Sequence, residues 1–266
     1  MSKKFAFVLL VDDNSFLGAK VTISGILLHA SRPFKIVVFY WNLSQQNKNK
    51  IKSMDSNIVF KKIPQEDYKN CKFASFPRNW DYNCAYRFEI FTLCEYDKIV
   101  YIDCDFLIQN NISKLFRKNI KFGAVRAEGD CLIQGNKHFN AGLLVIDKEY
   151  LNNNIKKELI NLCSSAAPLF NDKTEWISDE PVLNFFFKDV SFLEKKYNYL
   201  VTTLKINKDK DVNYHFNGDI KPWGKKSFDE AFNSCFFKCF INKNGIKGVI
   251  FLKRLFSLYT KILNQN

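Results

Sequence analysis

Apolar and polar positions alternate along the first 187 residues in two different rhythms. Short apolar runs rich in β-branched and aromatic residues predict strands at 5–11, 36–41, 58–63, 98–102, 122–126 and 142–147. Between them, helical periodicity or a capping residue predicts helices at 17–30, 44–54, 84–94, 150–163 and 179–187. Strands that alternate with helices are typical of an α/β fold with a mostly parallel sheet.

The composition fits one large globular domain, or a domain with an appendage. The 266 residues are 47% hydrophobic, with 27 Phe and only 10 Gly, which excludes fibrous and disordered classes. The first apolar run has seven residues before two acids, and no other run approaches the roughly 18–20 residues that a membrane span needs. We therefore expect a cytoplasmic protein.

The basic excess is concentrated near the C-terminus. The net charge is +13, and residues 235–266 contain six basic residues and no acidic one. Helical spacing there places five apolar residues on one face, namely Val249, Leu252, Phe256, Tyr259 and Leu263. The basic residues Lys253, Arg254 and Lys261 gather on the other face. We expect residues 1–230 to form the main domain and residues 231–266 a basic amphipathic helical tail.

Such a tail should lie on an anionic membrane surface, which makes the protein peripheral on the inner face of the cytoplasmic membrane. The alternative is a last helix that packs against the core. Nucleic acid is another partner for a basic chain, but no recognised nucleic-acid-binding motif is present, so none is expected.

Two aspartates follow the apolar run that begins at Lys98. Asp103 and Asp105 stand where this strand should end, and ligands of open α/β sheets bind at the carboxyl ends of strands. Residues i and i+2 share a face, so both carboxylates can point into one site, where they repel each other unless a cation lies between them. The expected cation is hard, Mg²⁺ or Mn²⁺, and shared with a phosphate. The alternative is a solvated turn.

Four further stretches accompany this pair in sequence order. They are "LLVDDNSF" near the start, "HFNAGLLVID" from His138, "SDEPVLN" from Ser178 and "HFNGDIKPW" from His215. Together with "YIDCD", they resemble the donor-site motifs of glycosyltransferase family 8, over about residues 5–223. The resemblance implies a GT-A fold, a Rossmann-like mixed sheet flanked by helices. It also implies a retaining transferase that moves galactose or glucose from a UDP-sugar to a saccharide or glycolipid acceptor, as in bacterial lipooligosaccharide or lipopolysaccharide synthesis, with Mn²⁺ (or Mg²⁺).

The same resemblance assigns the residues around the diphosphate. Asp103, Asp105 and His215 are the expected metal ligands, although His215 could instead be a core histidine between Tyr214 and Phe216. Gly218 lets the backbone approach a phosphate, and Lys221 adds a positive charge. The other expected donor-binding residues are Asp12 and Asn14 at the uridine and ribose, Arg87, Cys104, and Asn140, Ala141 and Gly142 beneath the sugar.

The resemblance places Asp179 and Glu180 beside the anomeric carbon as the catalytic pair. Many relatives have Asp-Gln here, so Glu180 is a departure that makes a carboxylate available. We expect same-face attack, with Glu180 stabilising the cationic centre and Asp179 orienting sugar hydroxyls. A covalent intermediate on Glu180, as on the nucleophile of retaining glycosidases, is the alternative.

Two other classes of function remain at this point. Haloacid-dehalogenase phosphatases also place Asp-x-Asp after a strand and bind Mg²⁺, but near the start of the chain and with Thr or Val where Leu107 stands. A non-enzymatic basic module for membrane or nucleic acid would leave the five ordered motifs unexplained.

Overall fold

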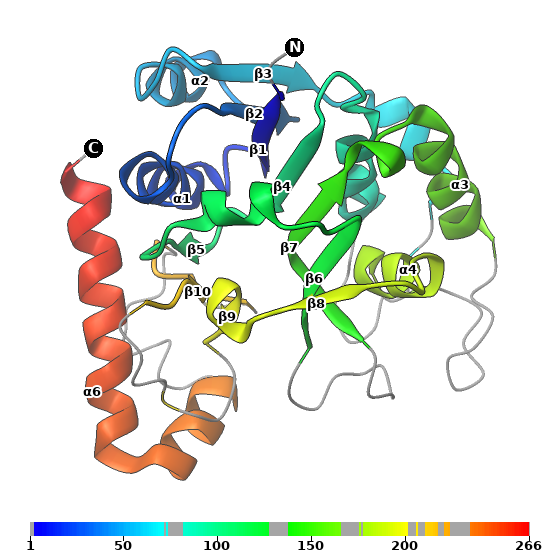
Figure 1. The fold of residues 1–266 in the computed structure, drawn as a ribbon. Helices are drawn as coiled ribbons and strands as arrows, with labels where there is room; N and C mark the ends of the chain where they lie inside the picture. Colours follow the sequence, from blue (N-terminus) through cyan, green and yellow to red (C-terminus); the bar gives the residue numbers. More distant parts are fainter. Residues whose placement is uncertain are drawn as a thin grey trace.

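A computed structural model of the chain describes residues 3–71, 73, 82–127, 138–165, 176, 178–201, 206, 211–217, 221–223 and 235–265, with side chains of the last helix from Asn244 onward. A seven-stranded sheet with helices on both faces forms the centre (Figure 1). A three-stranded sheet and a long C-terminal helix lie beside it (Figure 1).

The large sheet has the strand order β3-β2-β1-β4-β7-β6-β8. Its strands are β1 (Phe5–Val11), β2 (Lys35–Tyr40), β3 (Ile58–Lys62), β4 (Lys98–Ile102), β6 (Phe122–Arg126), β7 (Phe139–Asp147) and β8 (Ser191–Leu193). The pairs β3·β2, β2·β1, β1·β4 and β6·β8 are parallel, whereas β7 is antiparallel to both β4 and β6. The predicted α/β fold with a mostly parallel sheet is confirmed, and β7 begins three residues before the predicted start at 142.

Helices cover the two faces of this sheet. On one face lie α1 (Phe16–His29), α2 (Gln45–Lys52) and the 3-10 segment η3 (Ile112–Arg117). On the other lie η1 (Gln65–Tyr68), η2 (Tyr82–Thr92), α3 (Asn153–Ser164) and α4 (Asp179–Phe186). The short segments η4 (Lys148–Tyr150) and η5 (Lys195–Tyr197) lead into α3 and out of β8. The helix predicted at 84–94 is present, but as a 3-10 helix that begins at Tyr82.

The small sheet was not expected from the sequence. Its strands are β5 (Phe106–Leu107), β10 (Tyr214–His215) and β9 (Tyr199–Leu200), in the order β5-β10-β9. Strand β5 directly follows the aspartate pair in the turn after β4, and β10 pairs with β5 although more than a hundred residues separate the two strands. The small sheet therefore links the C-terminal part of the chain to the end of β4.

The C-terminal helix α6 (Cys235–Gln265) packs on α1 and on this small sheet. Its residues Leu252, Phe256 and Tyr259, expected on a membrane-facing surface, are 1%, 9% and 0% exposed. The prediction that this apolar face lies in a membrane is therefore wrong, because the face covers aromatic side chains of the domain, and the core-packed alternative is confirmed. Ring contacts join Tyr259 to Phe216 and Trp223.

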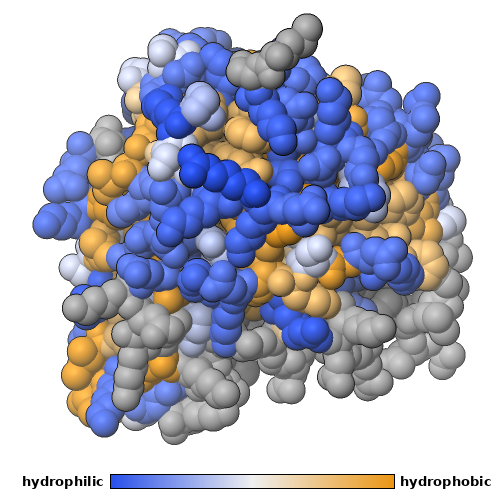
Figure 2. Space-filling view, viewed as in Figure 1, coloured by the Kyte–Doolittle hydropathy of each residue, from blue (hydrophilic) through white to orange (hydrophobic). Residues whose placement is uncertain are grey.

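The outer side of α6 is different. Ile246 and Ile250 are 76% and 62% exposed, and Figure 2 shows apolar surface along this helix. A kink at Gly245, where φ is 58°, divides α6 into two helical parts. Among the described residues, no helix combines the length and the apolar character needed to cross a membrane.

Candidate active site

The aspartate pair is fixed in a turn between β4 and β5. Strand β4 is buried along its whole length, and the backbone N–H of Asp103 donates to the carbonyl of Gly142 on β7 at 2.9 Å. From α1, the hydroxyl of Thr22 lies 3.0 Å from the Cys104 carbonyl and accepts a hydrogen bond from the N–H of Phe106 at 3.2 Å. The two carboxylates therefore project from a turn whose backbone is held in place by β4, β7 and α1.

Backbone pairing brings His215 to this turn. In the β5·β10 ladder His215 is the partner of Phe106, and the next N–H, that of Phe216, donates to the Asp105 carbonyl at 2.9 Å. The imidazole stacks on the Phe106 ring with centroids 4.5 Å apart. Its other side faces Gly142, where an added Cβ would lie 2.3 Å from Cε1 of His215. Only glycine leaves room for the ring there.

Asp103, Asp105 and His215 can hold one divalent cation. One ligand atom from each residue lies within 4.8 Å of the others. His215 Nε2 is 3.1 Å from Asp105 Oδ1 and 3.7 Å from Asp103 Oδ2, and Asp105 Oδ1 is buried without a hydrogen-bond partner. A buried carboxylate oxygen without a hydrogen-bond partner lowers the stability of the fold unless a cation binds to it. Two carboxylates and one imidazole suit Mn²⁺ or Mg²⁺ with open positions for a ligand.

Two basic side chains also contact these aspartates. Lys221 contacts the Asp105 carboxylate and donates to the Phe216 carbonyl at 2.8 Å. Burial raises the pKa of Asp105, but the positive charge of Lys221 and the neighbouring imidazole of His215 outweigh burial, so this pKa lies well below its usual range. Arg87 donates to Asp103 at 3.0 Å and contacts Asp179. The contact with Lys221 therefore favours the ionised form of Asp105.

The acids at the start of α4 lie next to this cluster. Glu180 Oε2 accepts hydrogen bonds from the Ala141 N–H at 2.8 Å and from Asn140 Nδ2 at 3.0 Å. Burial raises the pKa of Glu180 to about 7 and that of Asp179 to about 6, although Arg87 opposes both shifts. Both acids stand in the first helical turn, where the helix dipole favours negative charge.

An irregularity in β7 supplies the N–H groups for this arrangement. Ala124 of β6 pairs with Leu144, but the next residue, Val125, pairs with Asn140, so residues 141–143 have no partner on β6. Bulges of this kind redirect side chains and backbone groups beside active sites. Here the bulge directs the Ala141 N–H toward Glu180 and the Gly142 N–H toward Asn140 Oδ1.

A cavity of about 290 Å³ opens over the cluster, and a set of predicted residues lines it: Asp12, Arg87, Asp103, Cys104, Asp105, Asp179 and Lys221. The Cys104 thiol donates to the Leu10 carbonyl at 2.9 Å, so this side chain is bonded to β1. The lining does not include Asn140, Ala141, Gly142, Glu180 or His215, nor does it include Asn14. It is exposed and donates to Asp12 Oδ2 at 3.2 Å. Gly218 lies outside the described residues.

Several lining or supporting residues were missed by sequence reasoning. Trp41 lines the cavity, the hydroxyl of Tyr101 contacts Asp103, and Asn198 bonds to His215. Trp223, the last residue of the motif that begins at His215, also lines the cavity. Tyr101 stands two residues before Asp103 on the same strand, so the period of two could have identified it. No comparable signal exists for Asn198, which belongs to none of the five motifs.

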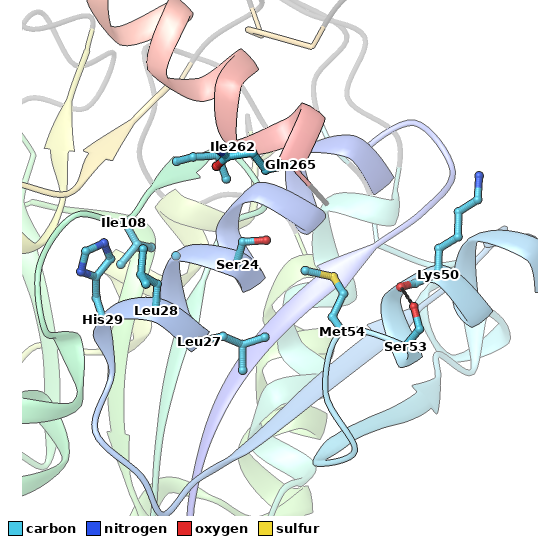
Figure 3. A pocket seen from close by; sticks show the side chains of 11 residues that line it. Ser24, Leu27, Leu28, His29, Lys50, Ser53, Met54, Ile108, Ile262 and Gln265 are labelled. Carbon is cyan, nitrogen blue, oxygen red and sulfur yellow. Dashed lines mark hydrogen bonds between the residues drawn. The ribbon is translucent and has the colours of Figure 1, made fainter.

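A second cavity, of about 540 Å³, lies at the other end of α1 (Figure 3). Leu27, Leu28, Met54 and Ile262 give it an apolar lining. Its Ser24 and Ser53 hydroxyls bond to carbonyls of their own helices, at 2.8 Å each. Although larger, this cavity has no convergent set of acids or bases, so the chemistry lies at the smaller one.

Comparison with known proteins agrees with the geometry. The sequence profile described as Glycosyl transferase family 8 matches residues 6–227. Glycosyltransferase GlyA of Streptococcus pneumoniae serotype 4 is 25% identical over 193 residues, which are 68% of this chain and 26% of GlyA. Glycosyltransferase GlyF of the same organism is 23% identical over 238 residues, covering 83% of this chain and 58% of GlyF. The chain thus spans about a quarter and just over half of these two relatives.

Solved structures share the fold. An active-site mutant of LgtC, in which glutamate replaces a glutamine, superposes with a TM-score of 0.65 at 19% identity, covering 90% of this chain and 95% of LgtC. The galactosyltransferase LgtC in complex with donor and acceptor sugar analogues gives a TM-score of 0.63 at 19% identity, covering 88% and 95%. The GT-A fold expected from the sequence is therefore confirmed.

Proposed function

The chain belongs to glycosyltransferase family 8, and on this premise we propose that it transfers a hexose, galactose or glucose, from a UDP-sugar to a saccharide acceptor with retention of configuration. The acceptor we propose is a bacterial surface glycan or glycolipid such as lipooligosaccharide. The observation that supports this best is the Asp103–Asp105–His215 cluster beneath a cavity that Asp179 also lines. Family membership argues against the phosphatase and the non-enzymatic binding module.

The metal end of the site would neutralise the leaving group. Asp103, Asp105 and His215 would hold Mn²⁺ or Mg²⁺, which supplies positive charge at the donor diphosphate. Lys221, already beside Asp105, would add a second positive charge, and Gly218 would let the backbone approach a phosphate. Such preorganised charge favours departure of UDP because it matches negative charge that develops in the transition state.

The nucleoside end would lie against β1 and β2. Asp12 follows β1 and lines the cavity, and its carboxylate is oriented by the N–H of Ser15 at 2.9 Å. Asn14, bonded to Asp12, would reach the uridine or ribose from the rim. Trp41 offers an aromatic surface at the end of β2 on which a base can stack.

The sugar would lie between Arg87 and the start of α4. Asp179, in contact with Arg87, would orient sugar hydroxyls. Glu180 is held from below by Asn140 and the Ala141 N–H, so its charge is fixed under the anomeric centre as the cationic character develops. We propose same-face attack by the acceptor, with Glu180 as electrostatic stabiliser.

The deciding experiment is hydrolysis of a panel of nucleotide sugars without acceptor. We expect release of UDP from UDP-galactose or UDP-glucose with Mn²⁺, loss of at least 100-fold of the rate in excess chelator, and recovery on adding Mn²⁺ back. A full rate in chelator would contradict the metal assignment. Hydrolysis of other nucleoside diphosphate sugars in preference to UDP-sugars would contradict the proposed donor.

We also propose that the outer side of α6 contacts an anionic membrane, which brings the enzyme to a glycolipid acceptor. Lys253 and Arg254 are exposed there, beside the exposed Ile250. Each basic residue near an anionic surface contributes about 1 kcal/mol. Replacing Lys253 and Arg254 by Glu should release the protein from phosphatidylglycerol vesicles without changing donor hydrolysis. Equal binding of both proteins would contradict the proposal.

A further inference from the structure

Asn198 occupies a buried position between the metal cluster and the support of Glu180. It follows η5, precedes β9 and is only 1% exposed. Its Nδ2 lies 2.8 Å from Asn140 Oδ1, and its Oδ1 lies 2.9 Å from Nδ1 of His215. One side-chain amide thus touches a residue of each of the two parts of the site.

Asn140 and Asn198 form a chain of hydrogen bonds, and the backbone N–H of Gly142 at one end fixes the orientation of both side-chain amides. The Gly142 N–H can only donate, and it lies 3.0 Å from Asn140 Oδ1. Asn140 must therefore direct its Nδ2 toward Glu180 Oε2, where a carboxylate accepts at 3.0 Å. Because the same Oδ1 of Asn140 can only accept, the group of Asn198 that faces it is the NH₂.

The other side-chain atom of Asn198, its Oδ1, then determines the tautomer of His215. This Oδ1 is an acceptor, so Nδ1 of the neutral imidazole must carry the hydrogen. Nε2 is left with its lone pair, which faces Asp105 Oδ1 at 3.1 Å and Asp103 Oδ2 at 3.7 Å. This is the tautomer that a metal ligand requires on Nε2, and a hydrogen bond to the second ring nitrogen is the usual way to fix it.

We propose that Asn198 is a positioning residue that fixes the Nδ1–H tautomer of His215 and the amide orientation of Asn140, and so couples the metal ligand to the support of Glu180. The tautomer depends on the hydrogen-bond geometry alone, whereas the effect on metal binding rests on the proposed function. Asparagine suits the position because it offers one acceptor and one donor in opposite directions. Aspartate would serve His215 but not Asn140, and alanine would serve neither.

The tautomer can be read without metal, donor or turnover. In metal-free protein, ¹⁵N shifts of the ring nitrogens recorded above the pH at which His215 becomes neutral distinguish the two tautomers. The chain has only three histidines, so His215 can be assigned by substitution. We expect Nδ1–H in the wild type and in Asn198→Asp, and a mixture in Asn198→Ala. An Nε2–H tautomer in the wild type would overturn the proposal without any variant.

Mn²⁺ binding and donor hydrolysis test the coupling. Loss of an outer hydrogen-bond partner typically weakens metal binding by about 10- to 100-fold, and we expect this for Asn198→Ala, measured by electron paramagnetic resonance of free Mn²⁺. In Asn198→Asp we expect Mn²⁺ affinity within about 3-fold of wild type but a hydrolysis rate at least about 10-fold lower, since only the bond to Asn140 is lost. If Asn198→Asp loses both Mn²⁺ affinity and hydrolysis, or keeps both, the proposed coupling of His215 to the support of Glu180 is overturned.

Asn213→Ala is the matched control. Asn213 is also fully buried, and its Oδ1 accepts from the N–H groups of Gln109 and Asn110, at 2.9 and 3.0 Å. Its removal should lower the melting temperature while leaving the His215 tautomer and Mn²⁺ affinity unchanged. If Asn198→Ala behaves like this control, Asn198 is merely structural and the proposal is overturned. If wild-type protein binds no Mn²⁺, the metal assignment fails, and the tautomer still decides the first half of the proposal.

Discussion

The candidate metal site, formed by Asp103, Asp105 and His215, joins two regions of the molecule that are built in different ways. Asp103 and Asp105 extend from β4, a fully buried strand in the middle of a seven-stranded sheet. His215 belongs to β10, a two-residue strand in a three-stranded sheet. In the large sheet, the long apolar run of β4 positions Asp103 and Asp105. In the small sheet, ring stacking on Phe106 and the pairing of β10 with β5 position His215. Two of the candidate ligands therefore depend on a single strand, whereas the third depends on pairing between segments that are distant in the sequence.

The small sheet owes much of its support to the C-terminal helix. Phe216, next to His215, contacts the rings of Phe256 and Tyr259 on α6. Burial of these aromatic groups stabilises the small sheet, since a two-residue strand has too few backbone hydrogen bonds to be stable alone. We therefore infer that α6 holds the histidine half of the cluster in place.

Removing a ligand from the large-sheet half should have the largest effect. Asp105→Asn keeps the shape of the side chain but removes the charge that a cation and Lys221 share, so we expect donor hydrolysis to fall by more than about 10³-fold. Stopped assays of UDP release would measure this. Asp97→Asn, at the opposite end of β4, is the control and should keep wild-type activity. An active Asp105→Asn enzyme would show that the carboxylate pair is not the metal site.

Glu180 is linked to the histidine half through Asn140 and Asn198, and its pKa of about 7 makes it a pH probe. Hydrolysis should rise about 10-fold per pH unit below pH 7, because only the ionised carboxylate stabilises a cationic centre. Glu180→Gln should lower the rate roughly 10- to 1000-fold, abolish this rise and keep the stereochemistry. A covalent adduct on Glu180 in the mass spectrum, or azide rescue with inverted product, would contradict same-face attack.

The same raised pKa predicts the sign of a stability effect. Burial favours the protonated form of Glu180, so the folded protein retains a proton that the unfolded chain releases above the ordinary pKa of 4.5. The contribution of this group to stability is therefore greatest below pH 4.5 and declines as the pH rises to about 7. In chemical denaturation, Glu180→Gln should flatten this decline relative to wild type.

Gly142→Ala tests the contribution of His215 to metal binding separately from that of the two aspartates. The added Cβ would lie 2.3 Å from His215 Cε1 and 2.9 Å from Asn140 Oδ1, so the imidazole must move. We expect Mn²⁺ binding weakened by about 10- to 100-fold, with Asp103 and Asp105 still in place. Gly123→Ala is a control in the same sheet, where the Cβ would meet Ile120 at 2.7 Å. It should cost stability only, and equal loss of Mn²⁺ binding in both variants would argue against a specific role for Gly142.

Phe256→Ala should have the smallest effect on activity and a clear effect on stability. Truncating a buried phenylalanine costs about 3–5 kcal/mol, and Phe256 is 9% exposed, so we expect the lower end of this range in urea unfolding. Hydrolysis at low temperature should change by less than about 10-fold. Ile250→Ala, on the exposed side of α6, should change stability by less than about 0.5 kcal/mol. Equal stability of the two variants would contradict the packing of α6.

The sequence predicted the large sheet well because its strands carry long apolar runs. β1 to β4 and β6 were all expected near their observed bounds, and so was the helix capped by Ser44. The small sheet could not be predicted, because strands of two residues have no detectable period. For α6, periodicity identified the apolar face but not what covers it. Asn198 was missed for a similar reason, since the role that we propose for it depends on two partners, Asn140 and His215, that are distant in the sequence.

The tryptophans of the chain have a practical consequence. Trp41 follows β2 and Trp223 follows the small sheet, and both line the cavity, whereas Trp176 is buried in the large core. The cavity therefore contains two intrinsic fluorophores that enter from different parts of the fold. Paramagnetic Mn²⁺ and a stacked base should quench them differently, so single Trp→Phe variants would allow cation and nucleotide binding to be followed separately by emission alone, in the unlabelled protein.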